Sequence, residues 1–134
     1  MILIDSNILL DIFTEDPVWY AWSSKTLAEL FDKHSLAINP IIYAEVSIGF
    51  KKIEDLEEAL PLDSFECLPL SKEIAFLAGK SFLKYKKNGG QKGATLPDFF
   101  IGAHAAILNI PLLTRDVNRY KTYFPGLTLI SPEI

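Results

Sequence analysis

The sequence predicts an α/β fold built around a mostly parallel sheet. Short apolar runs that end in polar residues alternate with longer segments of helical periodicity, which is typical of β-α-β organisation. Asp5 follows one such run, ILI at 2–4, and Asp116 follows another, IPLLT at 110–114. Parallel strands end at the same edge of a sheet, and ligands bind at that edge. We therefore expect a single domain over residues 1–134 with a polar site where these strands end.

The elements follow from apolar runs, helical periodicity and helix-start signals. Asn39 followed by Pro40 predicts a helix start, because asparagine caps helices and proline has no N–H to satisfy at the first position. Thr95 and Asp98 have the spacing of a capping box. The expected strands are 2–5, 36–38, 65–68, 111–114 and 127–130. The expected helical segments are 7–13, 19–33, 40–62, 71–88, 98–109 and 116–123.

The composition is that of a globular protein with a sizeable core. Of 134 residues, 49% are hydrophobic, which suffices for one domain. The single cysteine, Cys67, excludes an internal disulfide framework, and its apolar surroundings, FECLPL, predict a buried thiol. The most apolar segment, 99–108, is too short to span a bilayer and contains His104. We expect a cytoplasmic protein with no membrane partner.

The charge balance argues against a surface coated with basic residues. There are 17 acidic and 13 basic residues, so the net charge is −4. Four of the acidic residues occupy positions suited to one site: Asp5, Glu45, Asp98 and Asp116. Without them, the numbers of acidic and basic residues are equal, since 17 minus 4 is 13. A neutral body with one acidic cluster favours a bound cation over a broad nucleic-acid-binding face.

Glu45 is the most informative acidic residue. On a helix that begins at Pro40, its neighbours three and four positions away are Ile41, Ile42, Ile48 and Gly49. Burying a carboxylate is costly unless it is paired, protonated or bound to a metal ion. A structural salt bridge is the alternative to a functional role, which we favour.

Asp5, Asp98 and Asp116 could each cap a helix or lie in its first turn. Together with Glu45 at one sheet edge, however, they would repel one another unless a positive charge lay between them. Carboxylates suit Mg²⁺ or Mn²⁺. Such an ion makes a bound water more acidic and stabilises charge on a phosphoryl oxygen, so phosphodiester hydrolysis is the fitting reaction. The sequence leaves open whether one or two ions bind.

Polar residues beside two of these acids are candidates for supporting roles. Ser6, Asn7 and Thr114 could orient a carboxylate or a metal-bound water. Ordinary turn and capping chemistry is the alternative.

Basic residues near the predicted site are candidates for contacts with phosphates. Three lie in the stretch KYKKNGGQKG at 84–93, which we expect to form a positively charged loop, and one precedes Asp116. They are Lys86, Lys87, Lys92 and Arg115. Such contacts would position a substrate without reading any sequence. A solvated charged surface is the alternative.

Five ordered motifs resemble those of PIN-domain ribonucleases, and within that family the VapC-like toxins of toxin–antitoxin modules. The resemblance extends over nearly the whole chain. The motifs are ILIDSN at 2–7, IYAEVSIG at 42–49, LPDFFIGAHA at 96–105, PLLTRD at 111–116 and YFPGLTLISP at 123–132.

This resemblance implies a three-layer α/β/α sandwich and a Mg²⁺- or Mn²⁺-dependent endoribonuclease. Its acidic site would consist of Asp5, Glu45, Asp98 and Asp116. Asn7 and Thr114 match polar positions beside that site. The resemblance further implies a homodimer and a small antitoxin protein whose tail covers the active site and whose other part binds operator DNA.

Three other functions remain open from the residues. A phosphatase with Asp5 as nucleophile would want a second acid two positions on, where Asn7 stands. A phosphorylated receiver module would want paired acids at its first strand. A PIN-like protein retained only for binding would not need all four acids.

Overall fold

The computed structural model describes residues 1–61, 63–90 and 93–132, and in these residues five short strands form one parallel sheet. The order across the sheet is β3-β2-β1-β4-β5, and every neighbouring pair is parallel. This confirms the predicted sheet, although several strands are shorter than expected. The strands are β1 (Ile2–Ile4), β2 (Leu36–Ile38), β3 (Phe65–Cys67), β4 (Leu112–Leu113) and β5 (Leu129–Ile130).

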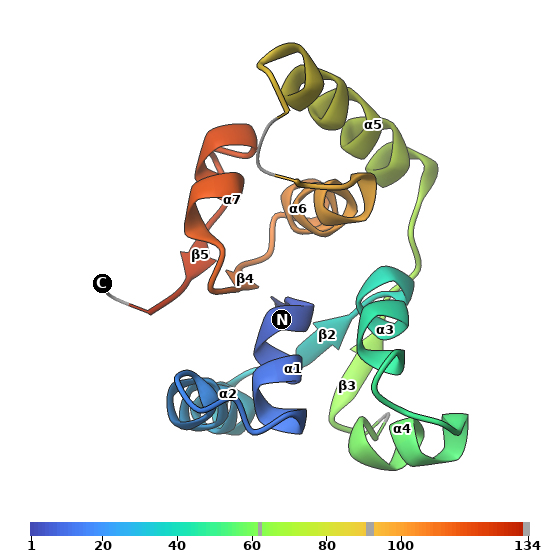
Figure 1. Ribbon diagram of the computed structural model, residues 1–134, viewed down its shortest axis with the longest axis vertical. Helices are drawn as coiled ribbons and strands as arrows, with labels where there is room; N and C mark the ends of the chain where they lie inside the picture. The colour runs from blue at the N-terminus through green and yellow to red at the C-terminus, as the bar shows by residue number, and fades with distance from the viewer. Residues whose placement is uncertain (62, 91–92, 133–134) are drawn as a thin grey trace.

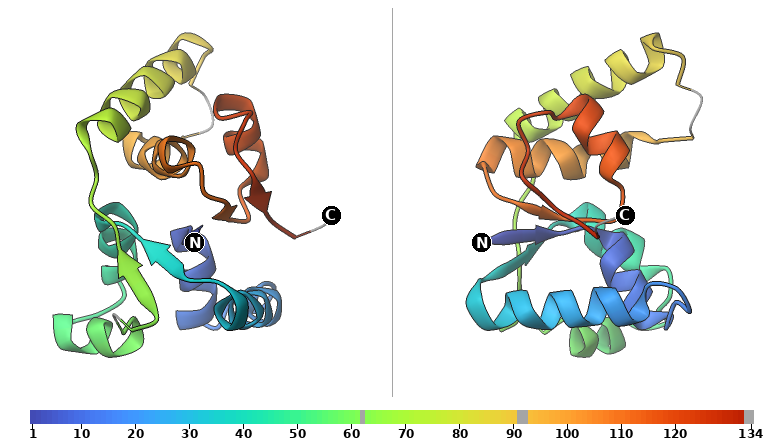
Figure 2. Two further views of the ribbon diagram at one scale, coloured as in Figure 1. Left: turned by 180° about the vertical axis from the view of Figure 1, so that it is seen from behind. Right: turned by 90° about the vertical axis from the view of Figure 1, so that its left-hand side faces the viewer.

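Helices cover both faces of the sheet, as the α/β/α sandwich requires. In Figures 1 and 2, α1, α2 and α4 lie on one side of the sheet, and α5, α6 and α7 lie on the other. Helix α3 contacts both α1 and α6. The helices are α1 (Ser6–Phe13), α2 (Tyr20–Lys33), α3 (Pro40–Ser47), α4 (Ile53–Ala59), α5 (Lys72–Lys87), α6 (Leu96–Leu108) and α7 (Val117–Tyr123).

The single helix expected over 40–62 is wrong, because α3 and α4 are separate helices. The amide of Gly49 bonds to the carbonyl of Val46, and that of Phe50 bonds to the carbonyl of Ser47, so the chain turns after α3. Ile48, which continues the apolar stripe in the sequence, is 87% exposed. Residue 62 lies outside the described residues. The helix start at Asn39 is confirmed, since Asn39 Oδ1 accepts from the Ile42 amide at 2.8 Å.

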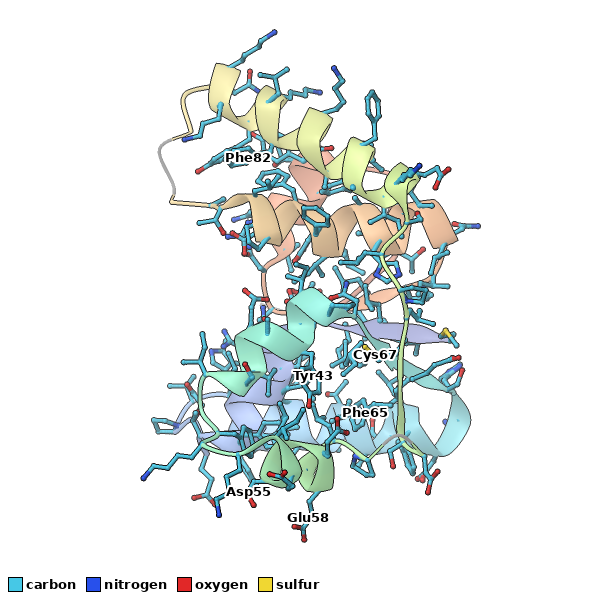
Figure 3. The ribbon with its side chains drawn as sticks, turned by 90° about the vertical axis from the view of Figure 1, so that its right-hand side faces the viewer. Tyr43, Asp55, Glu58, Phe65, Cys67 and Phe82 are labelled. Carbon is cyan, nitrogen blue, oxygen red and sulfur yellow. The ribbon has the colours of Figure 1, made fainter. Side chains whose placement is uncertain are left out.

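The core lies between the sheet and its two helical layers. Leu3, Ile4 and the two residues of β4 are fully buried. On the α6 side, aromatic rings fill the space: Phe82 of α5 points towards α6 (Figure 3), where its centroid lies 5.5 Å from that of Phe99. Among the described residues, no helix combines the length and apolar character needed to cross a membrane.

Cys67 is exposed, so the prediction of a buried thiol is wrong. It ends β3, the edge strand, whose residues Phe65, Glu66 and Cys67 are buried, exposed and exposed in turn. Figure 3 shows Cys67 near Tyr43 and Phe65. The apolar sequence around Cys67 did not reveal that its strand lies at the edge of the sheet.

Candidate functional site

Asp5 is the buried centre of the candidate site. It follows β1, and Thr114 follows the adjacent parallel strand β4, so the sheet brings these two residues together. Asp5 is 4% exposed, and its Oδ2 accepts a hydrogen bond from the Thr114 hydroxyl at 2.8 Å and from the Tyr120 hydroxyl at 3.0 Å. Asn7 Nδ2 lies 3.3 Å from the same oxygen. Asp5 is therefore held in one orientation by donors from three parts of the chain.

Glu45 lies next to Asp5 through Ser6. The Ser6 hydroxyl donates to Glu45 Oε1 at 2.9 Å and lies 3.4 Å from Asp5 Oδ1. This contact arises because α3, which carries Glu45, packs against α1, which begins at Ser6. Ser6 thus bridges two of the predicted acids.

Asp98 and Asp116 are joined by Arg119. Asp98 lies in the first turn of α6, where its Oδ2 accepts from the Thr95 amide at 2.7 Å, which confirms the predicted capping box. Asp116 precedes α7, and its Oδ2 lies 2.6 Å from Arg119 Nη1. The same nitrogen lies 3.6 Å from Asp98 Oδ1. A guanidinium therefore lies between two of the four acids.

Burial and mutual repulsion make the first two acids harder to ionise. Burial raises the pKa of Asp5, hydrogen bonds from Thr114 and Tyr120 partly offset this effect, and the charge of Asp116 raises it further. Burial likewise raises the pKa of Glu45, against the lowering effect of the Ser6 hydrogen bond, and the charges of Asp5 and Asp98 add to the rise. The four acids therefore act on one another electrostatically, and the cluster favours a cation.

The carboxylates of the site suit Mg²⁺ or Mn²⁺, but an ion would have to compete with Arg119 for them. In residues 1–61, 63–90 and 93–132, no three acidic, histidine or cysteine side chains lie close enough to form a ready-made metal cluster. The positive charge near the acids is instead that of Arg119, which is also among the groups that lower the pKa of Glu45. Four carboxylates suit a hard divalent cation. A cation held by Asp98 and Asp116 would compete with Arg119 for these two carboxylates.

The polar residues predicted to support the site contact its acids. Besides its bond to Asp5, the Thr114 hydroxyl accepts from the Asp116 amide at 3.0 Å and lies 3.3 Å from Asn7 Nδ2. Asn7 Oδ1 accepts from the Arg115 amide at 3.3 Å. Thr114 and Asn7 thus fix the turn that carries Asp116 relative to Asp5.

The predicted RNA-binding residues have different surroundings. Lys86 and Lys87 are exposed in the last turn of α5, and Lys86 Nζ lies 5.4 Å from the centroid of Phe82. Lys92 lies outside the described residues. Arg115 forms two hydrogen bonds of 2.7 Å with the buried Asp11. Contacts of Arg115 with RNA stay a prediction, but the structure gives its side chain a packing role.

Sequence reasoning missed Arg119 and Tyr120. Both lie on α7, three and four positions after Asp116, which is the spacing that places side chains on the same helical face as Asp116. That spacing was the available signal. A basic residue three positions from an acid is common on helices, so it did not stand out.

Comparison with known proteins bears on the family and the fold of the chain. The family model described as PIN domain matches residues 2–125. No curated protein sequence matches the chain.

Solved structures of the same fold include toxin–antitoxin complexes. A chain of VapBC2 from Rickettsia felis, bound to a DNA fragment from its promoter, is 25% identical with a TM-score of 0.74, covering 99% of this chain and 100% of that one. A chain of a Klebsiella pneumoniae toxin–antitoxin complex is 26% identical with a TM-score of 0.72, covering 99% and 98%. VapC20 from Mycobacterium tuberculosis, a sarcin–ricin loop cleaving toxin, is 9% identical with a TM-score of 0.70, covering 98% and 100%, and shows the fold alone.

Proposed function

The chain belongs to the PIN-domain family, and from this premise we propose that it is a metal-dependent endoribonuclease, the toxin of a VapBC-type module. The observation that carries the proposal is the convergence of Asp5, Glu45, Asp98 and Asp116 at the carboxyl edge of a PIN-type sheet, linked through Ser6 and Arg119. A cluster of this composition suits the binding of a divalent cation and of a phosphodiester.

The residues of the site would have different roles in phosphodiester hydrolysis. Mg²⁺ or Mn²⁺, held by the four acids, would supply a more acidic water and stabilise charge on the phosphoryl group. Thr114 and Tyr120 hold Asp5 in position and keep its Oδ2 hydrogen-bonded. Ser6 fixes Glu45 beside Asp5 through its hydroxyl group. Arg119 is the charged group placed to contact a phosphate.

RNA is the proposed substrate, and the cytoplasm is the proposed place of action. The resemblance of the five motifs to PIN-domain ribonucleases supports this choice. Lys86, Lys87 and Lys92 would contribute phosphate contacts whose strength falls with salt. Replacing all three with alanine should reduce the salt dependence of RNA binding and spare metal binding.

We also propose a homodimer and a cognate antitoxin. The support for the antitoxin is that the similar chains from R. felis and K. pneumoniae come from toxin–antitoxin complexes, one of them on promoter DNA. The homodimer is what the resemblance to VapC-like toxins implies. In this proposal the antitoxin covers the acidic site and carries the contact with operator DNA.

Cleavage of a labelled total-RNA pool tests the function. Purified protein is incubated with Mg²⁺, Mn²⁺ or a chelator, beside the variants Asp98→Asn and Asp32→Asn. Asp32 is exposed on α2, on the other side of the sheet from α6, and serves as the matched control. Metal-dependent cleavage should be lost in Asp98→Asn, by roughly a hundredfold or more, and kept in Asp32→Asn. Full cleavage by Asp98→Asn would overturn the proposed site, and metal binding without cleavage by the wild type would favour a binding-only role.

A further inference from the structure

A pocket of about 530 Å³ opens directly beside the acidic site, between the end of α5 and the face of α7. Its volume is that of a small-molecule site. Asp116 and Arg119 belong both to its wall and to the acidic site. We call it the α5–α7 pocket, and the lining residues that matter here are Asn88, Asp116, Asn118, Arg119, Thr122 and Tyr123.

One wall of the pocket is aromatic, and its ring packs against neighbouring rings. The Tyr123 ring is half-buried and packs edge-on against two further rings, Tyr85 at 5.8 Å and Phe99 at 5.5 Å between centroids. A ring fixed in this way loses little freedom when a ligand packs against it. Aromatic side chains of this kind stack with nucleobases of any sequence.

Polar groups around that ring provide hydrogen-bond donors and acceptors and a positive charge. Asn88 and Asn118 are exposed and carry side-chain amides, which can donate to or accept from the edge of a base. The Thr122 hydroxyl donates to the Asn118 carbonyl at 2.8 Å and can still accept a hydrogen bond. Arg119 provides a positive charge on the side next to the acids.

The charge around the pocket also suits a nucleotide. The last turn of α5 carries three lysines and leads directly into Asn88 on the pocket wall. These lysines are Lys84, Lys86 and Lys87. A phosphate entering from this side therefore approaches basic groups, although the protein as a whole is acidic.

We propose that the α5–α7 pocket binds one unpaired nucleotide of the RNA substrate, next to the phosphate that is cut. This inference rests on the proposed function. The base would stack on Tyr123 and meet the amides of Asn88 and Asn118, while its phosphate would face Arg119. A base inside a duplex has both faces covered by stacking, so only an unpaired base could enter the pocket.

Binding in a chelator tests the pocket without cleavage. The probe is a fluorescein-labelled, unstructured ten-nucleotide RNA of mixed sequence, and the readout is fluorescence anisotropy at low salt. Thr122→Glu places a negative charge on the pocket wall, where it would repel the phosphate of the bound nucleotide, and should weaken binding by about tenfold. Asn118→Ala, which removes one amide, should weaken it by about threefold. A blunt duplex of ten base pairs, which has no unpaired nucleotide, should bind weakly to the wild type and be insensitive to Asn118→Ala.

The matched control is Thr14→Glu, which adds the same charge elsewhere. Thr14 is exposed at the end of α1, and its hydroxyl donates to the carbonyl four residues back at 2.7 Å, as that of Thr122 does. Helix α1 lies on the other side of the sheet from α7 (Figure 1). Equal thermal midpoints for the two glutamate variants would show that any difference in binding is local.

The outcomes separate this inference from the nuclease proposal. If Thr122→Glu and Asn118→Ala bind the single-stranded probe as tightly as the wild type, the pocket assignment is overturned, whether or not the protein cleaves RNA. If the probe binds in a pocket-dependent manner and the wild type cleaves nothing with either metal, the pocket stands and the nuclease proposal fails.

Discussion

Arg119 forms an ion pair with Asp116, with 2.6 Å between Nη1 and Oδ2, and the same nitrogen is 3.6 Å from Asp98 Oδ1. The guanidinium is about three-quarters buried. Burial lowers the pKa of Arg119, but the charges of Asp98 and Asp116 outweigh this and raise it overall. The chain thus provides its own cation for two carboxylates that are proposed metal ligands.

Neutralising Arg119 should tighten metal binding. In Arg119→Gln the oxygens of Asp98 and Asp116 are freed from a competing charge, so the affinity for Mn²⁺ should rise about fivefold, as expected for one ion pair of about 1 kcal/mol. Isothermal titration with Mn²⁺ measures this directly. Lys121→Gln removes an exposed charge from the same helix and is the control. Unchanged or weaker binding in Arg119→Gln would show that Arg119 does not compete with the ion.

Arg115 should be more important for stability than for RNA binding. Its guanidinium bonds twice to Asp11, which is 3% exposed and also accepts from the Ser23 hydroxyl at 2.6 Å, and it lies 4.9 Å from the centroid of Trp19. Removing the Arg115 side chain takes away the ion pair that offsets the cost of burying the Asp11 carboxylate. Arg115→Ala should therefore lower the free energy of unfolding by about 2–3 kcal/mol.

Urea denaturation gives the stability, and the salt dependence of RNA binding gives the second readout. For Arg115→Ala the salt slope should match that of the wild type, whereas Lys86→Ala combined with Lys87→Ala should reduce the slope and leave stability unchanged. A smaller slope for Arg115→Ala at full stability would show that Arg115 contacts RNA, as expected from the sequence.

His104 should make stability depend on pH near neutrality. It is fully buried on α6, Asn39 Nδ2 lies 2.9 Å from its Nδ1, and in the described part of the chain its Nε2 has no hydrogen-bond partner. Burial lowers its pKa below the ordinary 6.5. Below pH 6.5 the unfolded chain therefore takes up a proton that the folded protein does not. The free energy of unfolding thus decreases as the pH is lowered, by at most about 1.4 kcal/mol per pH unit.

Urea denaturation between pH 5.5 and 7.5 measures this slope. His104→Asn keeps an acceptor for Asn39 and removes the titration, so its unfolding free energy should vary less with pH over this range. His34→Asn, at an exposed position after α2, should keep the wild-type slope. The same slope in all three proteins would mean that other groups cause the dependence.

The sheet edge could be predicted from sequence because the three central strands, β2, β1 and β4, are each followed directly by a polar residue. Asp5 and Asp116 were placed together by one rule, that parallel strands share an edge. Glu45 was found because a carboxylate interrupts an apolar stripe. These signals depend on residue order alone, so they needed no knowledge of packing.

The missed features depend on packing between elements. Whether Tyr120 reaches Asp5 depends on how α7 is rotated about its axis, which its own sequence does not determine. The turn after Val46 was missed because Ile48 and Ile53 continued the apolar pattern, although both are exposed. Cys67 was misplaced because the order of strands in the sheet decides which strand lies at the edge.

Two helical glycines should respond to alanine in opposite ways. Gly102 lies in α6, and a Cβ there would lie 2.6 Å from Cδ2 of the buried Phe124 ring, so the ring or the helix would have to move. Overpacking of this kind costs about 1–3 kcal/mol and exceeds the gain in helix propensity of about 1 kcal/mol. Gly79 lies in α5, and among the described residues no atom outside its own helix turn lies within 4 Å of the place that an added methyl group would take, so only the gain remains.

Gly102→Ala should therefore lower the thermal midpoint, and Gly79→Ala should raise it by a few degrees, corresponding to about 0.5–1 kcal/mol. Each substitution adds one methyl group to a helix interior, so each serves as the control for the other. Differential scanning calorimetry gives both values. If Gly102→Ala were as stable as Gly79→Ala, the close approach of α6 to Phe124 would be relieved at no cost, and the packing of α7 against α6 would be looser than the structure indicates. Helix α7 would then also hold Arg119 and Tyr120 less firmly against the acids, because Phe124 directly follows that helix.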